Sequence, residues 1–507
     1  MLFLICVFEL AYTQVASGLE TLRGILVSRE EASLIASFEG HQRVVYALAF
    51  SPDGKTLASV DVEGSVKLWD VQNMRLVKTI PIRAEFITSV VFTPNGRFLA
   101  IAVDGKAIRF FDVKSEKFIR TIKTDVYSLS FDRTGKTLAS GGYSSVKLWD
   151  VQSGRLVRTI KGHNGIVLSV HFSPDGKTVA SGGEDGKIKL WEASTSKLLR
   201  TLEGHEGSVF SLSFSPTGKL LASGGLDGVL NIWDVRSGKV VHSFTAYEED
   251  GEGGENGEAL EEELEEERMS ESEEEGDVDY GFLGVAFSPD GKILASGNND
   301  GFLRIWDVQS GELIMATQAH EGEAISVAFS PDGKLLLSGG ADGVINFWNV
   351  EILTFTWLPP QWNPPQKDPF ETRAEHKKRV QEYRSRYESE VKAYVEKLVN
   401  TTLPYSRKLK VYAEQYDADN GGFTIILNEE YQIFIPIDRL KAKEMVQNGE
   451  SFILSGKLKY YDEDYLYLTD VYLHREKTKE RFNAYLVSGK NVEYEINIPE
   501  IYLPEVE

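Results

Sequence analysis

Cysteine is almost absent from this chain of 507 residues, since Cys6 is the only one. An intrachain disulfide and a cysteine-ligated metal site are therefore excluded. The apolar run Leu2–Phe8 is too short to cross a membrane as a helix, and we expect no membrane span. The sequence also offers no nucleophile paired with a base, no cage of metal ligands and no phosphate-cradling loop. We therefore expect neither an enzyme nor a cofactor.

Basic charge is scarce, and the acidic excess is unevenly distributed. The formal net charge is −22. Residues 247–280 contain 18 Asp or Glu and one Arg, a net of −17, so the rest of the chain carries only −5. A nucleic-acid-binding face needs a basic patch, and the rest of the chain shows none. Nucleic acid is therefore not an expected partner.

A repeated unit of four short strands accounts for most of the chain. Its clearest copy begins with residues 172–192, FSPDGKTVASGGEDGKIKLWE. The apolar run Val167–Phe172 predicts a strand, and Ser173–Gly176 predicts a turn, because proline presets φ and glycine accepts a positive φ. Three further strands are predicted over Lys177–Gly182, Lys187–Trp191 and Lys197–Leu202. Each unit therefore predicts one four-stranded antiparallel sheet.

The aromatic residue at the end of the third strand gives the period of the repeat. These residues are Trp69, Phe111, Trp149, Trp191, Trp233, Trp306 and Trp348. They are spaced by 42, 38, 42, 42, 73 and 42 residues, and the 73 is one period plus an insertion of 31. A fixed period in the low forties indicates a repeat architecture. We number the repeats first to seventh by these residues.

The repeats resemble the WD-repeat family over residues 34–350. The resemblance rests on Gly-His at 40–41, 162–163 and 204–205, Ala-His at 319–320, and Trp-Asp at 69–70, 149–150, 233–234 and 306–307. It implies a closed β-propeller, most often seven-bladed, that serves as a non-catalytic docking platform. We therefore predict a mainly β chain with a seven-bladed propeller over residues 29–350.

The resemblance also implies a buried hydrogen-bonded tetrad of His, Ser, Asp and Trp in each repeat. Three complete sets are expected: His163, Ser181, Asp185, Trp191; His205, Ser223, Asp227, Trp233; and His320, Ser338, Asp342, Trp348. The sixth repeat has Ser296, Asp300 and Trp306 without the histidine. Because the set recurs, we interpret it as structural, since a catalytic serine needs one unique site with an oxyanion hole.

The other repeats depart further from this pattern. The first has His41, Ser59 and Trp69, but Glu63 stands at the aspartate position. The second and third repeats lack most of the tetrad and the Gly-His dipeptide. We expect these two repeats to be the weak sector of the ring, since each lost buried hydrogen bond costs about 1 kcal/mol.

One position of the repeat is a candidate for partner binding. It lies four residues before the phenylalanine that ends each first strand, and in the family it often lies at the rim of the central opening. The candidates are Tyr46, Thr88, Tyr127, Leu168, Phe210, Leu283 and Ile325, a largely apolar and aromatic set. The other interpretation is that they pack between sheets, because they share strand parity with that phenylalanine.

The N-terminal segment, residues 1–28, has two interpretations. The run Leu2–Phe8 followed by Ala11–Thr13 resembles a signal peptide, which would make the protein exported or periplasmic. No Lys or Arg precedes the run and Glu9 interrupts it, which favours a buried strand or a tail and a cytoplasmic protein. Further on, Leu34–Phe38 matches the fourth strands of the other repeats and is expected to close the ring, with Leu353–Trp357 as the competing segment.

The acidic insert, residues 247–280, interrupts the connection between the fifth and sixth repeats. It is too highly charged to pack into a core. One interpretation is a solvated loop that contributes solubility. The other is a segment that captures a basic partner or masks the rim face.

The repeats stop after residue 350. A Pro-rich linker is predicted over 351–369, a helix over 370–400, and a small β module over 408–475, so that 370–507 form one C-terminal domain. Its strands are predicted at Lys408–Tyr416, Phe423–Leu427, Tyr431–Ile437, Phe452–Lys459 and Tyr465–Leu473, with a helix at Arg439–Asn448. Five strands with a helix before the fourth resemble an OB-like barrel.

Two features of this module suggest ligands but have simpler interpretations. The tyrosines at 460, 461, 465 and 467 are able to stack bases or sugars, yet the acidic residues at 462–464 oppose phosphate and favour a hairpin packed on the barrel. Asp417–Asn420 resembles the start of a calcium loop, but the later ligand positions are wrong, so we interpret it as a hairpin turn.

Together these features predict a monomeric, non-catalytic interaction scaffold. One face of the propeller, together with the acidic insert, would bind a protein or peptide of basic character. The alternative is an exported ligand-binding protein whose C-terminal OB-like module binds a saccharide or single-stranded nucleic acid.

Overall fold

The computed structural model describes residues 20–21, 25–28, 33–82, 84–245, 281–354, 375–386, 389, 403–410, 413–417, 422–426, 432–437, 439–447, 451–460, 465–475, 481–482 and 485–488. The chain divides into two compact units. One is Ser37–Val350, and the other combines Met1–Ala36 with Glu351–Glu507. The acidic insert and most of the Pro-rich linker lie outside the described residues.

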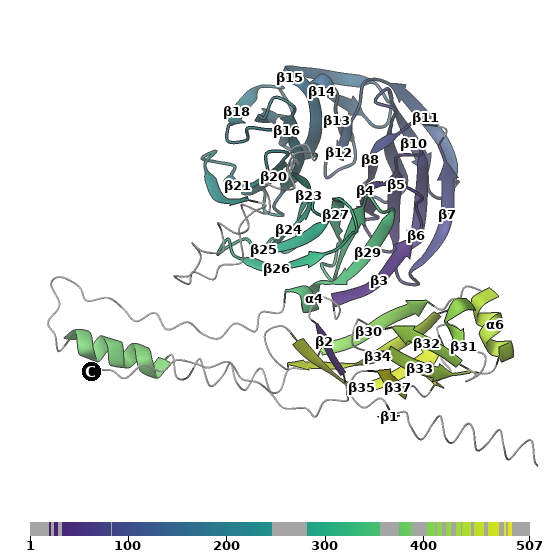
Figure 1. The fold of residues 1–507 in the computed structure, drawn as a ribbon. Coiled ribbons are helices and arrows are strands. Elements are labelled where there is room, and N and C mark those ends of the chain that lie inside the picture. Colours follow the sequence, from purple (N-terminus) through teal and green to yellow (C-terminus); the bar gives the residue numbers. More distant parts are fainter. Residues whose placement is uncertain are drawn as a thin grey trace, which may run out of the picture. The chain divides into compact units, whose positions relative to one another are not determined.

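The repeats form antiparallel sheets in which consecutive strands are neighbours (Figure 1). The first sheet contains β4 (Val45–Phe50), β5 (Thr56–Asp61), β6 (Ser65–Asp70) and β7 (Arg75–Pro81). The second contains β8 (Ile87–Phe92), β9 (Phe98–Val103), β10 (Ala107–Asp112) and β11 (Lys117–Lys123). The fifth repeat forms β19 (Val209–Phe214), β20 (Leu220–Gly225), β21 (Val229–Asp234) and β22 (Val240–Thr245). The sixth forms β23 (Phe282–Phe287), β24 (Ile293–Asn298), β25 (Phe302–Asp307) and β26 (Leu313–Gln318).

The third and fourth repeats share one sheet of seven strands. Their strands are β12 (Ser128–Phe131), β13 (Thr137–Gly141), β14 (Tyr143–Asp150), β15 (Leu156–Phe172), β16 (Thr178–Gly183), β17 (Ile188–Glu192) and β18 (Leu198–Leu202). The 17-residue strand β15 serves as the last strand of the third repeat and the first strand of the fourth. The two repeats therefore continue into each other without a separate loop.

The seventh repeat takes its fourth strand from the start of the chain. Its own strands are β27 (Ala324–Phe329), β28 (Leu335–Gly340) and β29 (Val344–Asn349), and β3 (Leu34–Glu39) lies beside β29. Phe38 of β3 contacts Phe347 and stacks on Trp69, with ring centroids 4.7 and 5.2 Å apart. Leu353, the first residue of the competing segment, instead ends the short helix α4 (Val350–Leu353).

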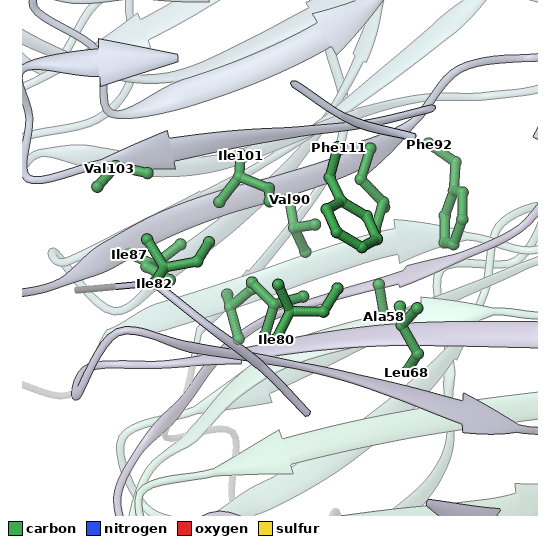
Figure 2. Packing of buried hydrophobic residues seen from close by; sticks show 13 residues of the cluster. Ala58, Leu68, Ile80, Ile82, Ile87, Val90, Phe92, Ile101, Val103 and Phe111 are labelled. Carbon is green, nitrogen blue, oxygen red and sulfur yellow. The ribbon is translucent and has the colours of Figure 1, made fainter. Parts of the chain in front are cut away.

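The first strands of the repeats contact one another in a closed cycle. Its order is β4, β8, β12, β15, β19, β23, β27 and again β4. Apolar side chains fill the space between neighbouring sheets. Figure 2 shows this between the first and second sheets, where Leu68 and Ile80 lie opposite Val90, Ile101 and Phe111. The sheets therefore form a ring, with their first strands around its centre.

Serine side chains link neighbouring first strands around this centre. The first strand is the edge of its sheet, so some of its N–H groups have no ladder partner. Five of these groups donate to a serine Oγ of the preceding repeat: Leu48 to Ser326, Leu129 to Ser89, Val170 to Ser128, Leu212 to Ser169 and Val285 to Ser211, at 3.0–3.2 Å. Ala47 and Gly284 occupy the serine position at the other two junctions.

Hydrogen-bonded tetrads fix the segment that leads into the first strand. In the fourth repeat, His163 Nδ1 lies 2.8 Å from Asp185 Oδ1 and Nε2 lies 2.8 Å from Ser181 Oγ, which also accepts from Trp191 Nε1. The fifth and seventh repeats have the same bonds, through His205, Ser223, Asp227, Trp233 and through His320, Ser338, Asp342, Trp348. The glycine before the histidine is required, because a Cβ at Gly162 would lie 2.6 Å from the Trp191 ring.

The first repeat also has a complete tetrad, which the sequence did not predict. Its carboxylate comes from Asp61, two residues before Glu63, and lies 2.6 Å from His41 Nδ1. Asp61 occupies the position of Gly183 in the fourth repeat, where a Cβ would lie 2.9 Å from the histidine ring. Glu63 instead accepts a hydrogen bond from exposed Arg43 at 2.9 Å. In the first repeat, the carboxylate of the tetrad thus comes from the position that is glycine in the fourth repeat.

The remaining repeats keep only part of the tetrad. Trp149 donates to Ser140 at 2.9 Å in the third repeat, and Trp306 donates to Ser296 at 3.0 Å in the sixth. The second repeat replaces both partners by apolar residues, Ile101 and Phe111, which share one buried cluster. Replacing both partners leaves no buried group unpaired and costs little. The expected weakness of this sector stays a prediction.

The described part of the second unit includes two sheets and helix α6 (Arg439–Gln447). One sheet has the order β2 (Ile25–Ser28), β35 (Tyr465–Arg475), β34 (Ser451–Tyr460), β30 (Leu403–Lys410), with β36 (Arg481–Phe482) also paired to β35. The other has the order β1 (Glu20–Thr21), β37 (Tyr485–Ser488), β33 (Gln432–Pro436), β32 (Gly422–Ile426), β31 (Tyr416–Asp417). Helix α6 (Arg439–Gln447) buries Ala442 and Met445.

Two boundaries that we predicted for this unit differ from the observed ones. Strands β1 and β2 come from the segment that we separated at residue 28, and they pair with β37 and β35 of the C-terminal domain. They cover strand edges, which a sheet otherwise leaves unpaired. The strand predicted over Lys408–Tyr416 ends at Lys410 and is followed by a 3-10 turn at Ala413–Gln415.

Only part of the predicted helix over 370–400 is described, and residues 375–386 are helical. Within the described ranges, no helix is long and apolar enough to cross a membrane.

We predict that Ser169→Ala lowers the free energy of unfolding by about 1–3 kcal/mol, because the buried N–H of Leu212 loses its acceptor. Ser194→Ala, on an exposed turn, is the matched control and should change it by less than about 0.5 kcal/mol. Urea denaturation of the full chain measures both. Equal effects of the two substitutions would contradict a role for serine in joining the first strands.

We predict that Asp61→Gly destabilises the chain by about 1–3 kcal/mol, because His41 loses its carboxylate partner. Adding Glu63→Asp should recover most of this loss, since it recreates the arrangement of the fourth repeat. Glu63→Asp alone removes only an exposed ion pair and should cost at most about 1 kcal/mol. A double variant no more stable than Asp61→Gly in urea would show that the two arrangements are not equivalent.

The tetrads also predict a pH dependence. Burial lowers the pKa of both His41 and His163, although their aspartate partners act in the opposite direction. Burial would raise the pKa of Asp61, but hydrogen bonds from His41 and Ser65 outweigh it and lower this pKa to about 2. All three groups therefore bind fewer protons in the folded chain than in the unfolded chain.

Because an unfolded histidine takes up its proton near about pH 6.5, the free energy of unfolding should fall as the pH is lowered from about 7 to about 5. The contribution of Asp61 should be lost between about pH 4 and pH 2. Urea midpoints measured across this range test both statements. A midpoint that is constant or rises on acidification from pH 7 would contradict the neutral, buried histidines.

Candidate partner-binding site at the centre of the ring

All seven residues selected by their repeat position line one cavity at the centre of the ring. Its volume is about 170 Å³. The lining contains Tyr46, Thr88, Tyr127, Leu168, Phe210, Leu283 and Ile325, together with the serines of the first-strand junctions. None of the tetrad residues belongs to the lining. A repeat with a tetrad therefore contributes to two separate features. Its tetrad residues belong to the framework, and its rim residue belongs to the cavity wall.

A β-bulge turns six of these seven side chains toward the cavity. Val45 of β4 pairs with Asp61, and Ala47 pairs with the adjacent Val60. Tyr46, which lies between them, is therefore the extra residue. The same shift occurs around Thr88, Leu168, Phe210, Leu283 and Ile325. An extra residue changes the strand parity and redirects its side chain. The parity argument for packing between sheets is therefore wrong at these six positions.

Tyr127 reaches the cavity differently. It lies immediately before β12, and its N–H donates to the carbonyl of Gly141 at 2.8 Å. A Cβ on Gly105, which has a φ of 60°, would lie 3.2 Å from the Tyr127 hydroxyl. The shape of the neighbouring hairpin therefore makes room for this tyrosine.

Two aromatic rings meet across the cavity. Tyr46 and Phe210 come from the first and fifth repeats, and their ring centroids are 6.3 Å apart at an angle of 57°. Burial raises the pKa of the Tyr46 hydroxyl, and the negative charge of Glu323 raises it further. A carboxylate thus lies near the aromatic part of the cavity mouth.

The cavity wall offers contact surface rather than reactive groups. Its side chains are aromatic, aliphatic or hydroxyl-bearing, and Thr88 Oγ1 is buried without a hydrogen-bond partner in the described part of the chain. In the same part of the chain, no three His, Cys, Asp or Glu side chains gather as metal ligands would. The arrangement is suited to holding an apolar group with some polar contacts.

Comparisons with known proteins agree with the repeat pattern. The model of the family "WD domain, G-beta repeat" matches residues 32–70, 116–150, 154–192, 196–234, 276–307 and 311–349. The first three strands of the second repeat, β8–β10, which carry Ile101 and Phe111 in place of the Ser–Trp pair, lie outside these six matches.

Two curated proteins illustrate the similarity. The chain is 28% identical over 159 residues to "Periodic tryptophan protein 2" of Arabidopsis thaliana, covering 30% of this chain and 18% of that protein. It is 25% identical over 175 residues to "Guanine nucleotide-binding protein subunit beta-1" of Caenorhabditis briggsae, covering 33% of this chain and 50% of that protein. The chain therefore spans half or less of the length of these relatives. The six matched repeats, arranged as antiparallel sheets around one centre, show that the chain belongs to the WD-repeat family.

Proposed function

We propose that this chain is a non-catalytic interaction scaffold, a seven-bladed propeller whose partner docks over the central cavity. WD-repeat proteins generally act as scaffolds for protein interactions, which supports the class. The observation that carries the proposal is the convergence of Tyr46, Tyr127, Phe210 and the four equivalent residues on one cavity.

The size of the cavity favours a protein or peptide over a small-molecule ligand. Ligand sites usually measure about 300–1,000 Å³, whereas this cavity measures about 170 Å³. A cavity of about 150 Å³ is able to hold a benzene molecule, so one aromatic or branched aliphatic side chain fits here. A partner would thus anchor one side chain in the cavity and cover the surrounding loops.

Two further elements have proposed roles that rest on sequence. The acidic insert ends three residues before Leu283, a residue of the cavity wall, and we assign it the role of attracting a basic partner to this face. The alternative function, saccharide or single-strand binding by an OB-like C-terminal module, has no supporting observation among the described residues. It stays a prediction.

We predict that the double variant Phe210→Ala with Tyr127→Asp loses at least about 100-fold in affinity for peptides selected by the full chain from a random library. Both side chains are half-buried at the cavity, so the melting temperature should fall by no more than about 5 °C. The matched control is Val241→Ala with Val157→Asp, on the exposed outer strands β22 and β15. Fluorescence polarisation measures the affinities. A control variant that loses binding while the cavity variant keeps it would overturn the proposal.

A further inference from the structure

The mouth of the cavity is asymmetric. Leu283 and Ile325 are only 8% and 6% exposed, and they lie on the side of the sixth and seventh repeats. Thr88, Tyr127 and Leu168, from the second to fourth repeats, are all half-buried. The rings of Tyr46, from the first repeat, and Phe210, from the fifth, contact each other between these two groups of residues. The accessible part of the cavity therefore lies beside Tyr127.

An exposed aromatic residue stands next to this accessible part. Tyr143 is 68% exposed at the tip of the hairpin between β13 and β14. Its N–H donates to Asp125 Oδ2 at 2.6 Å, and it pairs with Ile166 in the ladder. Asp125 and Ile166 each precede a cavity residue, Tyr127 or Leu168, by two positions. Tyr143 is thus placed to contact any chain that enters the cavity from this side.

The other large apolar side chains that are exposed in Ser37–Val350 belong to outer strands. Among the described residues they are Leu76, Val77, Ile119, Leu156, Val157, Leu198, Leu199, Val240, Val241 and Leu313. An exposed aromatic residue on an otherwise polar loop surface is the kind of anchor that dominates binding energy. Its position beside the cavity gives this sector two apolar contacts for one partner.

The loops on the opposite side carry exposed acidic residues. Glu206 precedes β19, and Glu321 and Glu323 precede β27, and all three are exposed. Two basic side chains on the side of the first and third repeats are already engaged. Arg43, in the loop before β4, pairs with Glu63, and Lys147 of β14 pairs with Asp125. In the second repeat, exposed Lys106 before β10 is opposed by exposed Glu85 before β8. The side of the fifth to seventh repeats therefore favours a positively charged group.

We propose that the partner is an extended peptide segment that inserts one apolar side chain beside Tyr127 and places an adjacent Lys or Arg over Glu206 and Glu323. This inference rests on the proposed function and specifies the partner class for the same site. Apolar insertion supplies most of the affinity, and the charges set orientation and association rate. Tyr143 contacts the residues on the other side of the inserted side chain.

The test uses peptides that the purified full chain selects from a random library. We expect them to carry an aliphatic or aromatic residue next to Lys or Arg. For such a peptide, Glu206→Gln with Glu323→Gln should weaken binding about fivefold to tenfold at low salt, and high salt should narrow the difference. The matched control, Glu116→Gln with Glu312→Gln at exposed positions of outer turns, should stay within about twofold.

A second variant tests the aromatic contact without disturbing the core. Tyr143→Ser should weaken binding of the same peptide at least about fivefold. Val157→Ser, at a residue that is 54% exposed on an outer strand, should not. Peptides that depend on Phe210 and Tyr127 but are acidic or uncharged would overturn the inference and leave the proposed function standing. Selected peptides that ignore the Phe210 and Tyr127 variant would overturn both.

Discussion

The bulge in six of the seven first strands is the constraint on which the centre of this molecule depends. A regular strand would point residues such as Tyr46 and Phe210 along the same face as the core phenylalanine four positions later. One extra residue breaks that alternation and releases a side chain from the packing between sheets. The same irregularity, repeated around the ring, produces a cavity wall whose chemistry is free to vary without loss of the core.

The bonds between neighbouring first strands hold this arrangement together. A serine hydroxyl accepts the free N–H of the next repeat at five junctions. The tetrads hold the segments that lead into four of the first strands. At the sixth repeat, Gly284 replaces serine because a Cβ there would lie 2.7 Å from the carbonyl of Ile325. The absence of a side chain at Gly284 therefore lets the two strands approach each other closely at this junction.

The period of the repeat was enough to predict most strands and the residues that reach the centre. It could not reveal that Asp61 completes the first tetrad. An alignment of the repeats pairs Glu63 with the aspartates of the other tetrads, and it does not show that a carboxylate two residues earlier reaches the same histidine nitrogen. The direction of the side chains at the bulges could not be predicted from strand alternation either. A shift in strand pairing does not change the pattern of apolar residues in the sequence. The strands β1 and β2 were missed because their partners lie more than 400 residues away, and short edge strands carry little pattern of their own.

The proposed function rests on departures from the repeat that lie around the central cavity. Thr88, Tyr127 and Tyr143 belong to repeats that lack the complete tetrad. Strands β8–β10 of the second repeat, which carries Thr88, lie outside the family match. The repeats with complete tetrads contribute the acidic loops, through Glu206 and Glu323. The proposed partner would place its apolar side chain beside Tyr127 and its basic side chain over the acidic loops.

Photo-crosslinking in the native host tests this account most directly. A photoreactive phenylalanine analogue would replace Tyr127 at the cavity, Val241 on an outer strand, or Leu440 on the exposed face of α6 in the C-terminal unit. The account predicts that one protein partner crosslinks from position 127 and not from 241 or 440. Crosslinking of the partner from 440 alone would place recognition on the C-terminal unit and contradict a docking role for the cavity.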